Sequence, residues 1–117
     1  VIDKYIDQVA VIGDQRNFVS AIIVPDMLEL KKYAKKEGID YETIDGLLKD
    51  KRIIQFVADR IGKLQEGMAG FEKIKKFILI ANGFTIESGE LTNTLKLRRS
   101  VILHKYKKAI DRMYNEG

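Results

Sequence analysis

The stretch VAVIGDQRNFVSAIIVPD, residues 9–26, contains two short apolar runs on either side of a polar loop. Residues 9–12 and 18–24 are rich in β-branched side chains, as strands are, and the Gly, Asp and Asn residues between them are typical of a turn. Pro25 ends the second run, because proline has no N–H to donate to a neighbouring strand. The stretch therefore predicts a strand–loop–strand unit.

Helical patterns follow this unit. Asp26 and Glu29 have the spacing of a capping box at a helix start, and Gly38 suits the position just after a helix end. Asp40 and Asp50 are further candidates for capping a helix start. After Asp50, apolar residues recur every three or four positions, which predicts one amphipathic helix facing a core. These positions are Ile53, Ile54, Val57, Ile61, Leu64 and Met68.

The remaining elements complete a small α+β pattern. Residues 74–80 predict a third strand, and residues 84–86 predict a short extended piece. A last helix is expected to start near Arg98 or Arg99. Its apolar stripe comprises Ile102, Tyr106, Ile110 and Met113. We therefore expect a single α+β domain, in which helices cover a small mixed or antiparallel sheet of about three strands.

The composition excludes several classes of site. The 117 residues include no cysteine and one histidine, so disulfides, thiol nucleophiles, zinc–thiolate sites and multi-histidine metal sites are excluded, and no metal site is predicted. No apolar run approaches the roughly 20 residues of a membrane-spanning helix. No secretory signal is visible, so we expect a cytoplasmic location, with a peripheral membrane location as the alternative. The first residue is Val1, from which we expect a piece of a longer protein.

Positive charge is concentrated near the C-terminus. Residues 96–112 contain seven basic residues and one acidic residue, whereas the rest of the chain has a net charge of −2. This asymmetry indicates either an anionic partner or a solvated basic helix face.

The stretch GELTNTLKLRR, residues 89–99, places Lys96 behind two threonines and ahead of two arginines. A lysine ammonium on a loop can reach an anion, and the hydroxyl groups of Thr92 and Thr94 can bind that anion or hold the loop's shape. Three interpretations remain open from the residues alone: a phosphate or nucleic-acid contact, a catalytic lysine, and a helix start with a solvated face. Neither a P-loop nor a dinucleotide-binding glycine motif occurs.

Other basic residues are weaker candidates for phosphate contacts. They are Arg98, Arg99, Lys73, Lys75 and Lys76. A solvent-exposed surface is the alternative explanation for each of them.

Two stretches resemble a known family. YIDQVAVIGDQRNFVSAIIVPD (residues 5–26) and FTIESGELTNTLKLRRSVILHKY (residues 84–106) are similar to the C-terminal domain of AMP-forming acyl-CoA synthetases. The long-chain fatty acid–CoA ligase branch is the most similar, and the resemblance extends over essentially the whole chain. Thr94 and Leu95 stand where many members of the wider superfamily have Ser-Gly, which favours that branch. Asn93 replaces a proline that the branch often has.

The resemblance implies an activity and a role for one residue. Such enzymes form an acyl-adenylate from a carboxylate and Mg-ATP, release pyrophosphate, and transfer the acyl group to coenzyme A. A large N-terminal domain binds ATP and the acid, and the C-terminal domain is a lid that rotates between the two half-reactions. A loop lysine of the lid enters the active site for adenylation, and the match places it at Lys96.

The resemblance also sets expectations about partners. The partners of this chain would be its own N-terminal domain, a fatty acid, ATP with Mg²⁺ and coenzyme A. No cofactor would be bound permanently, any membrane association would belong to the missing part, and the chain alone would be inactive. The alternative function, a basic nucleic-acid-binding α+β module, would show as salt-dependent binding.

Overall fold

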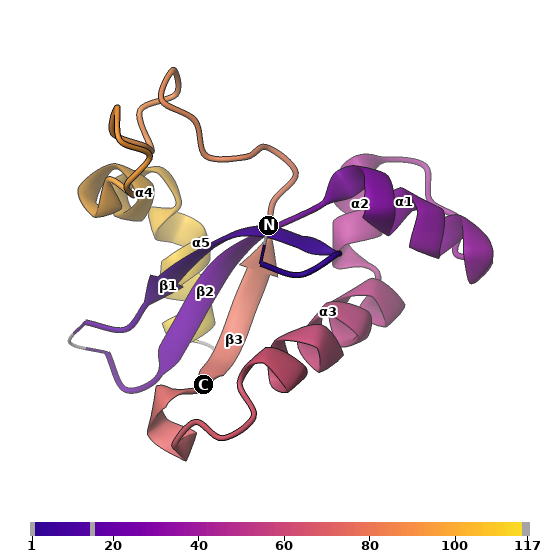
Figure 1. Cartoon of the computed structure of the whole chain (residues 1–117), viewed down its shortest axis with the longest axis horizontal. Coiled ribbons are helices and arrows are strands. Elements are labelled where there is room, and N and C mark those ends of the chain that lie inside the picture. Colours follow the sequence, from indigo (N-terminus) through magenta and orange to yellow (C-terminus); the bar gives the residue numbers. More distant parts are fainter. Residues whose placement is uncertain (1, 15, 116–117) are drawn as a thin grey trace. The chain divides into compact units, whose positions relative to one another are not determined.

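The computed structural model describes residues 2–14 and 16–115, and the chain divides into two compact units, residues 1–81 and 82–117. The first unit contains β1 (Ile6–Ile12), β2 (Val19–Pro25), α1 (Met27–Lys36), α2 (Ile44–Lys49), α3 (Lys51–Leu64), the 3-10 helix η1 (Gly70–Glu72) and β3 (Ile74–Leu79). The second contains a long loop, α4 (Arg99–Lys105) and α5 (Lys107–Asn115) (Figure 1).

The first unit is built on a mixed sheet with the strand order β1-β2-β3. β1 pairs antiparallel with β2, with Val9 opposite Ile23, and β2 pairs parallel with β3, with Ile22 opposite Ile78. A parallel pair needs a long crossover, and α1, α2 and α3 all lie in the chain between β2 and β3. The predicted α+β class with a small mixed sheet is confirmed.

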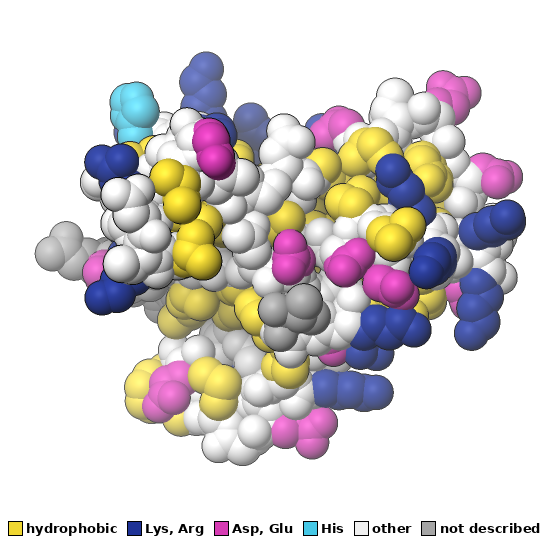
Figure 2. Space-filling view, turned by 45° about the horizontal axis from the view of Figure 1, so that its top comes forward, with side chains coloured by type: hydrophobic (Ala, Val, Ile, Leu, Met, Phe, Trp, Pro, Cys, Tyr) yellow, Lys and Arg dark blue, Asp and Glu magenta, His cyan; other side chains and the backbone are white. Residues whose placement is uncertain are grey.

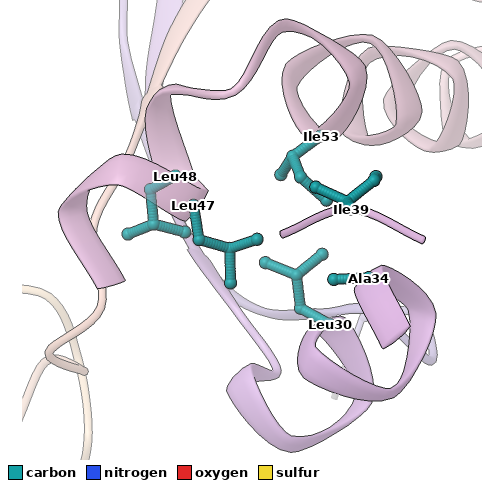
Figure 3. Packing of buried hydrophobic residues seen from close by; sticks show 6 residues of the cluster. All are labelled: Leu30, Ala34, Ile39, Leu47, Leu48 and Ile53. Atoms are coloured by element: carbon teal, nitrogen blue, oxygen red, sulfur yellow. The ribbon is translucent and has the colours of Figure 1, made fainter. Parts of the chain in front are cut away.

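Two apolar clusters hold the first unit together. In one, buried residues of the sheet pack with residues of α3: Ile6, Ala21, Ile23, Val57 and Ile61. The other joins α1, α2 and the start of α3 through Leu30, Ala34, Ile39, Leu47, Leu48 and Ile53 (Figure 3). Full burial of one such leucine or isoleucine contributes about 1.5–3 kcal/mol. These clusters fix the helices of this unit beside the sheet.

Most of the predicted helix signals act as expected. The N–H of Glu29 donates to Asp26 Oδ1 at 3.1 Å, and Asp50 caps α3 in a similar way. Gly38 has a φ of 70° just after α1, where a glycine avoids steric strain. The prediction for Asp40 is wrong, because the cap of α2 is Thr43, whose Oγ1 accepts the N–H of Gly46 at 2.9 Å.

The apolar stripe predicted for α3 extends too far. α3 ends at Leu64, and Gly67, with a φ of 87°, lies beyond its end. Met68 therefore lies outside the helix. Ile54 and Leu64 are 38% and 45% exposed, because the buried face is formed by residues four positions apart. Those residues are Ile53, Val57 and Ile61.

The predicted last helix is two helices. Tyr106 has φ −107° and ψ 20°, which separates α4 from α5. Ile102, Ile110 and Met113 are buried as expected. Neither glycine nor proline marks the break, so no local signal predicts it. Residues 84–86 form no strand. Among the described residues, no helix has the length and apolar character needed to cross a bilayer.

Candidate functional site

Lys96 lies at the end of a small hairpin loop in the second unit. Leu91 and Leu97 form an antiparallel bridge, and between them the N–H of Thr92 donates to the carbonyl of Lys96 at 2.8 Å. The N–H of Leu95 donates back to the carbonyl of Thr92 at 2.8 Å. These bonds close a three-residue loop, residues 93–95, of the type in which the third residue is left-handed.

The hydroxyl of Thr92 completes the loop. Its Oγ1 accepts the backbone N–H of Lys96 at 3.1 Å and lies 3.1 Å from Thr94 Oγ1. Thr92 therefore bonds both backbone groups of Lys96. A direct contact between either threonine and an anion stays a prediction.

Leu95 occupies the left-handed position of this loop, with a φ of 64°. A residue with a Cβ pays roughly 1–2 kcal/mol there, which is why glycine is usual. The side chain of Leu95 is also 67% exposed. The loop thus carries both backbone strain and exposed apolar surface beside Lys96.

A buried carboxylate anchors the base of the hairpin. Glu90 is 1% exposed, and its carbonyl accepts the N–H of Arg98 at 2.7 Å, on the opposite side of the hairpin. Its Oε2 accepts a bond from Lys105 Nζ at 2.6 Å, while its Oε1 accepts bonds from the N–H of Thr85 at 3.2 Å and from the hydroxyl of Ser88. These bonds tie the hairpin to α4.

The electrostatics of this anchor favour the charged pair. Burial acts to raise the pKa of Glu90, but the hydrogen bonds from Lys105, Ser88 and the N–H of Thr85 outweigh it, so the pKa is lowered. The hydrogen bond to Glu90 raises the pKa of Lys105 above its ordinary value. At neutral pH the anchor is therefore a carboxylate–ammonium pair.

The ammonium of Lys96 is exposed, and within residues 2–14 and 16–115 it has neither a hydrogen bond nor an ion pair. Its backbone is fixed while its charge is free to meet a ligand. A free ammonium on an ordered loop can stabilise negative charge on a phosphate or a carboxylate.

The other basic candidates are divided between the two units. Arg98 and Arg99 are exposed at the start of α4. Lys73 precedes β3, while Lys75 and Lys76 lie on it, and Lys76 Nζ lies 5.7 Å from the centre of the Phe18 ring. Figure 2 shows basic and acidic side chains interspersed on the face in view. A role for any of these residues in binding phosphate stays a prediction.

Comparison with known proteins assigns the chain to a family. Residues 1–117 match the model of the AMP-binding enzyme C-terminal domain. The chain belongs to this family. The match spans both units and includes the whole hairpin.

Relatives of this AMP-binding C-terminal domain are fatty acid ligases. "Long chain acyl-CoA synthetase 7, peroxisomal" from Arabidopsis thaliana is 33% identical over 117 residues, which cover 97% of this chain and 17% of that protein. "Long-chain-fatty-acid--CoA ligase ACSBG2" from Mus musculus is 36% identical over 90 residues, which cover 74% of this chain and 14% of that protein. This chain therefore spans only a small part of the length of these relatives.

A solved structure shares the fold. The A-PCP didomain of a carboxylic acid reductase from Segniliparus rugosus, in complex with AMP, matches 97% of this chain with a TM-score of 0.71 and 26% identity. The match covers 14% of that chain. The resemblance seen in the sequence is confirmed at the level of the family and the adenylate-forming superfamily.

Two features of this C-terminal domain were missed by the sequence analysis. Glu90 precedes the basic segment of residues 96–112, and its ion-pair partner, Lys105, is fifteen positions away in the chain. The sequence holds no local signal for this buried pair, because a glutamate is normally an exposed residue. The strain at Leu95 has none either, because leucine does not indicate a positive φ. No group of metal-ligating side chains suited to a metal ion occurs in the described part of the chain.

Proposed function

We propose that this chain is the lid of an AMP-forming long-chain fatty acid–CoA ligase, and that Lys96 promotes the adenylation half-reaction. The observation that carries the proposal is the exposed Lys96 ammonium, which lies on an ordered hairpin and has no bonding partner among the residues that the structure describes. Support also comes from the 33% identity to a long-chain acyl-CoA synthetase over 97% of the chain. ATP with Mg²⁺, the fatty acid and coenzyme A are substrates of the whole enzyme.

The reaction has two steps. In the first, a carboxylate oxygen of the fatty acid attacks the α-phosphorus of ATP, the bond from that phosphorus to the bridging oxygen breaks, and pyrophosphate leaves with the electron pair. In the second, the sulfur of coenzyme A attacks the acyl carbon, its thiol proton is lost, and AMP leaves as the thioester forms.

Lys96 acts in the first step. A carboxylate and an α-phosphate repel each other, and an ammonium placed between them offsets this repulsion. At 4 Å and an effective dielectric constant near 20, each contact is worth about 4 kcal/mol before desolvation. The bonds between Thr92 and Lys96 fix the backbone of Lys96, which limits the positions that its ammonium can reach. Pre-positioned charge of this kind is more effective than mobile charge.

The lid must then leave the site. Coenzyme A needs access to the acyl carbon that the hairpin covers, so the lid rotates between the two steps. In the second orientation, five basic residues are candidates for contacts with the phosphates of coenzyme A: Arg98, Arg99, Lys73, Lys75 and Lys76.

The chain by itself is inactive, because ATP and the acid are bound by the large N-terminal domain. The cytoplasmic location also stays a prediction.

The test is Lys96→Met in the full-length ligase. Methionine keeps the length of the stem and removes the charge, so ATP–pyrophosphate exchange should fall by roughly 10²–10³. Transfer of the acyl group from synthetic acyl-AMP to coenzyme A should be unchanged. Lys31→Met is the matched control, because Lys31 is an exposed lysine on α1, which belongs to the other unit of the chain. Undiminished exchange in Lys96→Met would refute the proposal, and salt-sensitive binding of nucleic acid would then favour the alternative function.

A further inference from the structure

Leu95 is the only residue other than glycine that has a positive φ in the described part of the chain. Four described residues have a positive φ, and the other three are Gly38, Gly67 and Gly89. At every other described position with this conformation, the chain thus has glycine. At the hairpin it uses leucine instead, at a position where glycine fits the loop type without strain.

Nothing within the hairpin compensates for this choice. The side chain of Leu95 is 67% exposed, and residues 93, 94 and 96 beside it are exposed and polar. The loop is closed by backbone bonds and by the hydroxyl of Thr92, none of which needs the leucine side chain. Strain that persists without local benefit often marks a functional position.

The position of Leu95 next to Lys96 indicates the step in which its side chain would be buried. It directly precedes Lys96, so the two α-carbons are about 3.8 Å apart and the residues must move together. When the hairpin carries Lys96 into the adenylation site, Leu95 enters the same cleft. There the exposed apolar surface can be buried, and the water around the ammonium can be displaced.

We propose that Leu95 is a positioning residue for adenylation, which packs against an apolar wall of the large N-terminal domain when Lys96 is engaged. This inference rests on the proposed function of Lys96. The occupant is the enzyme's own large domain, since the chain spans only 14–17% of the length of its relatives and the rest of such a protein must supply the cleft. Packing of Leu95 anchors the hairpin and excludes water, which strengthens the field of Lys96 on the reacting anions.

Three substitutions separate the side chain from the backbone conformation. Leu95→Gly removes both the strain and the apolar side chain. Leu95→Asn keeps a side chain that tolerates positive φ but is polar. Leu95→Met keeps the apolar volume together with the strain. A requirement for loop shape alone would be met by glycine and asparagine, whereas a requirement for an apolar contact is met by methionine only.

The experiment measures ATP–pyrophosphate exchange by the full-length ligase with octanoate and with palmitate. Leu95→Gly and Leu95→Asn should lower the kcat of exchange roughly 10- to 100-fold, equally for both acids, while Leu95→Met keeps most of the rate. The KM for ATP and transfer from synthetic acyl-AMP should stay at wild-type values. The melting temperature of Leu95→Gly should equal or exceed that of the wild type.

Two results would overturn the inference. One is wild-type exchange in Leu95→Gly, which would mean that the side chain has no role. The other is a loss seen with palmitate alone, which would place Leu95 on the acyl chain instead of the protein wall. Lys96→Met is assayed in parallel. If it keeps its exchange activity, the proposed function itself fails, and a loss in Lys96→Met with none in Leu95→Gly rejects the Leu95 inference alone.

Discussion

Lys105 Nζ lies 2.6 Å from Glu90 Oε2, so the last residue of α4 is bonded to the base of the hairpin that carries Lys96. The Glu90 side chain is 1% exposed, whereas that of Lys105 is 46% exposed. The Glu90 carbonyl also accepts the N–H of Arg98. Movement of Glu90 would therefore displace both sides of the hairpin.

Breaking this ion pair should destabilise the domain by an amount that depends on which partner is removed. Glu90→Gln keeps the shape but loses the charged hydrogen bonds, for an expected loss of about 1–3 kcal/mol in the free energy of unfolding. Lys105→Met leaves the buried carboxylate with Ser88 and the N–H of Thr85 only, for an expected loss of about 3 kcal/mol. Urea unfolding of the chain measures both values.

A matched control is available on α5. Lys107 pairs with Asp111 at 2.7 Å, but both side chains are exposed. Lys107→Met should therefore change the free energy of unfolding by less than about 1 kcal/mol. Equal losses in Lys105→Met and Lys107→Met would show that burial of Glu90 contributes nothing.

The same pair predicts how stability depends on pH. The pKa of Glu90 is lowered on folding, so its stabilisation is present above its ordinary pKa of 4.5 and is lost as the pH falls through the folded value. The pKa of Lys105 is raised, so its stabilisation is present below 10.5 and is lost as the pH rises through the folded value. The contribution of the pair should thus be constant between about pH 4.5 and 10.5. Urea midpoints measured across pH 3 to 7 should fall only at the acid end.

Lys105→Met tests the cause of this acid limit. Without Lys105, the remaining hydrogen bonds offset the effect of burial on Glu90 less completely, so the pKa of Glu90 should rise. The loss of stability at acid pH should then begin at a higher pH. An unchanged acid limit in Lys105→Met would assign the limit to another carboxyl, such as Asp3, whose pKa is lowered because its burial is outweighed by hydrogen bonds from Arg60 and the N–H of Tyr5.

Local signals predicted much of this fold. The caps at Asp26 and Asp50 and the left-handed Gly38 were predictable because each depends on residues within a few positions of itself. The break at Tyr106 has no local marker. It became visible only in three dimensions. Met68, by contrast, directly follows the left-handed Gly67, which is a local marker of a helix end.

The candidate site divides in the same way. The loop that carries Lys96 could be singled out from the sequence, because a lysine in a threonine-rich loop is a local pattern with a recognisable family resemblance. The catalytic role of Lys96 stays a prediction. The pair of Glu90 and Lys105 could not be predicted, because the acid has seven basic residues after it and only the fold selects one. Burial of Glu90 was equally invisible, since a glutamate is normally an exposed residue.

Thr92 should contribute to adenylation through the backbone of Lys96. Thr92→Val keeps the β-branched shape but removes the acceptor for the N–H of Lys96, so the kcat of pyrophosphate exchange in the full-length ligase should fall by about 10-fold. Thr92→Ser keeps the hydroxyl and should restore most of the rate. Thr94→Val leaves that acceptor in place and should have a smaller effect. A larger loss in Thr94→Val than in Thr92→Val would instead indicate that the Thr94 hydroxyl contacts the substrate.

Charge reversal at the basic candidates should weaken coenzyme A binding without slowing adenylation. Lys75→Glu and Arg98→Glu each replace an attraction for phosphate by a repulsion, so the KM for coenzyme A should rise about 10-fold in the transfer of the acyl group from synthetic acyl-AMP. Lys31→Glu and Lys108→Glu are controls with the same change of charge at exposed sites on α1 and α5. An equal rise in the controls would assign the effect to the net charge of the protein. If the KM for coenzyme A does not rise in one of the two test variants, the residue substituted in it does not contact coenzyme A, because a direct phosphate contact cannot survive reversal of the charge.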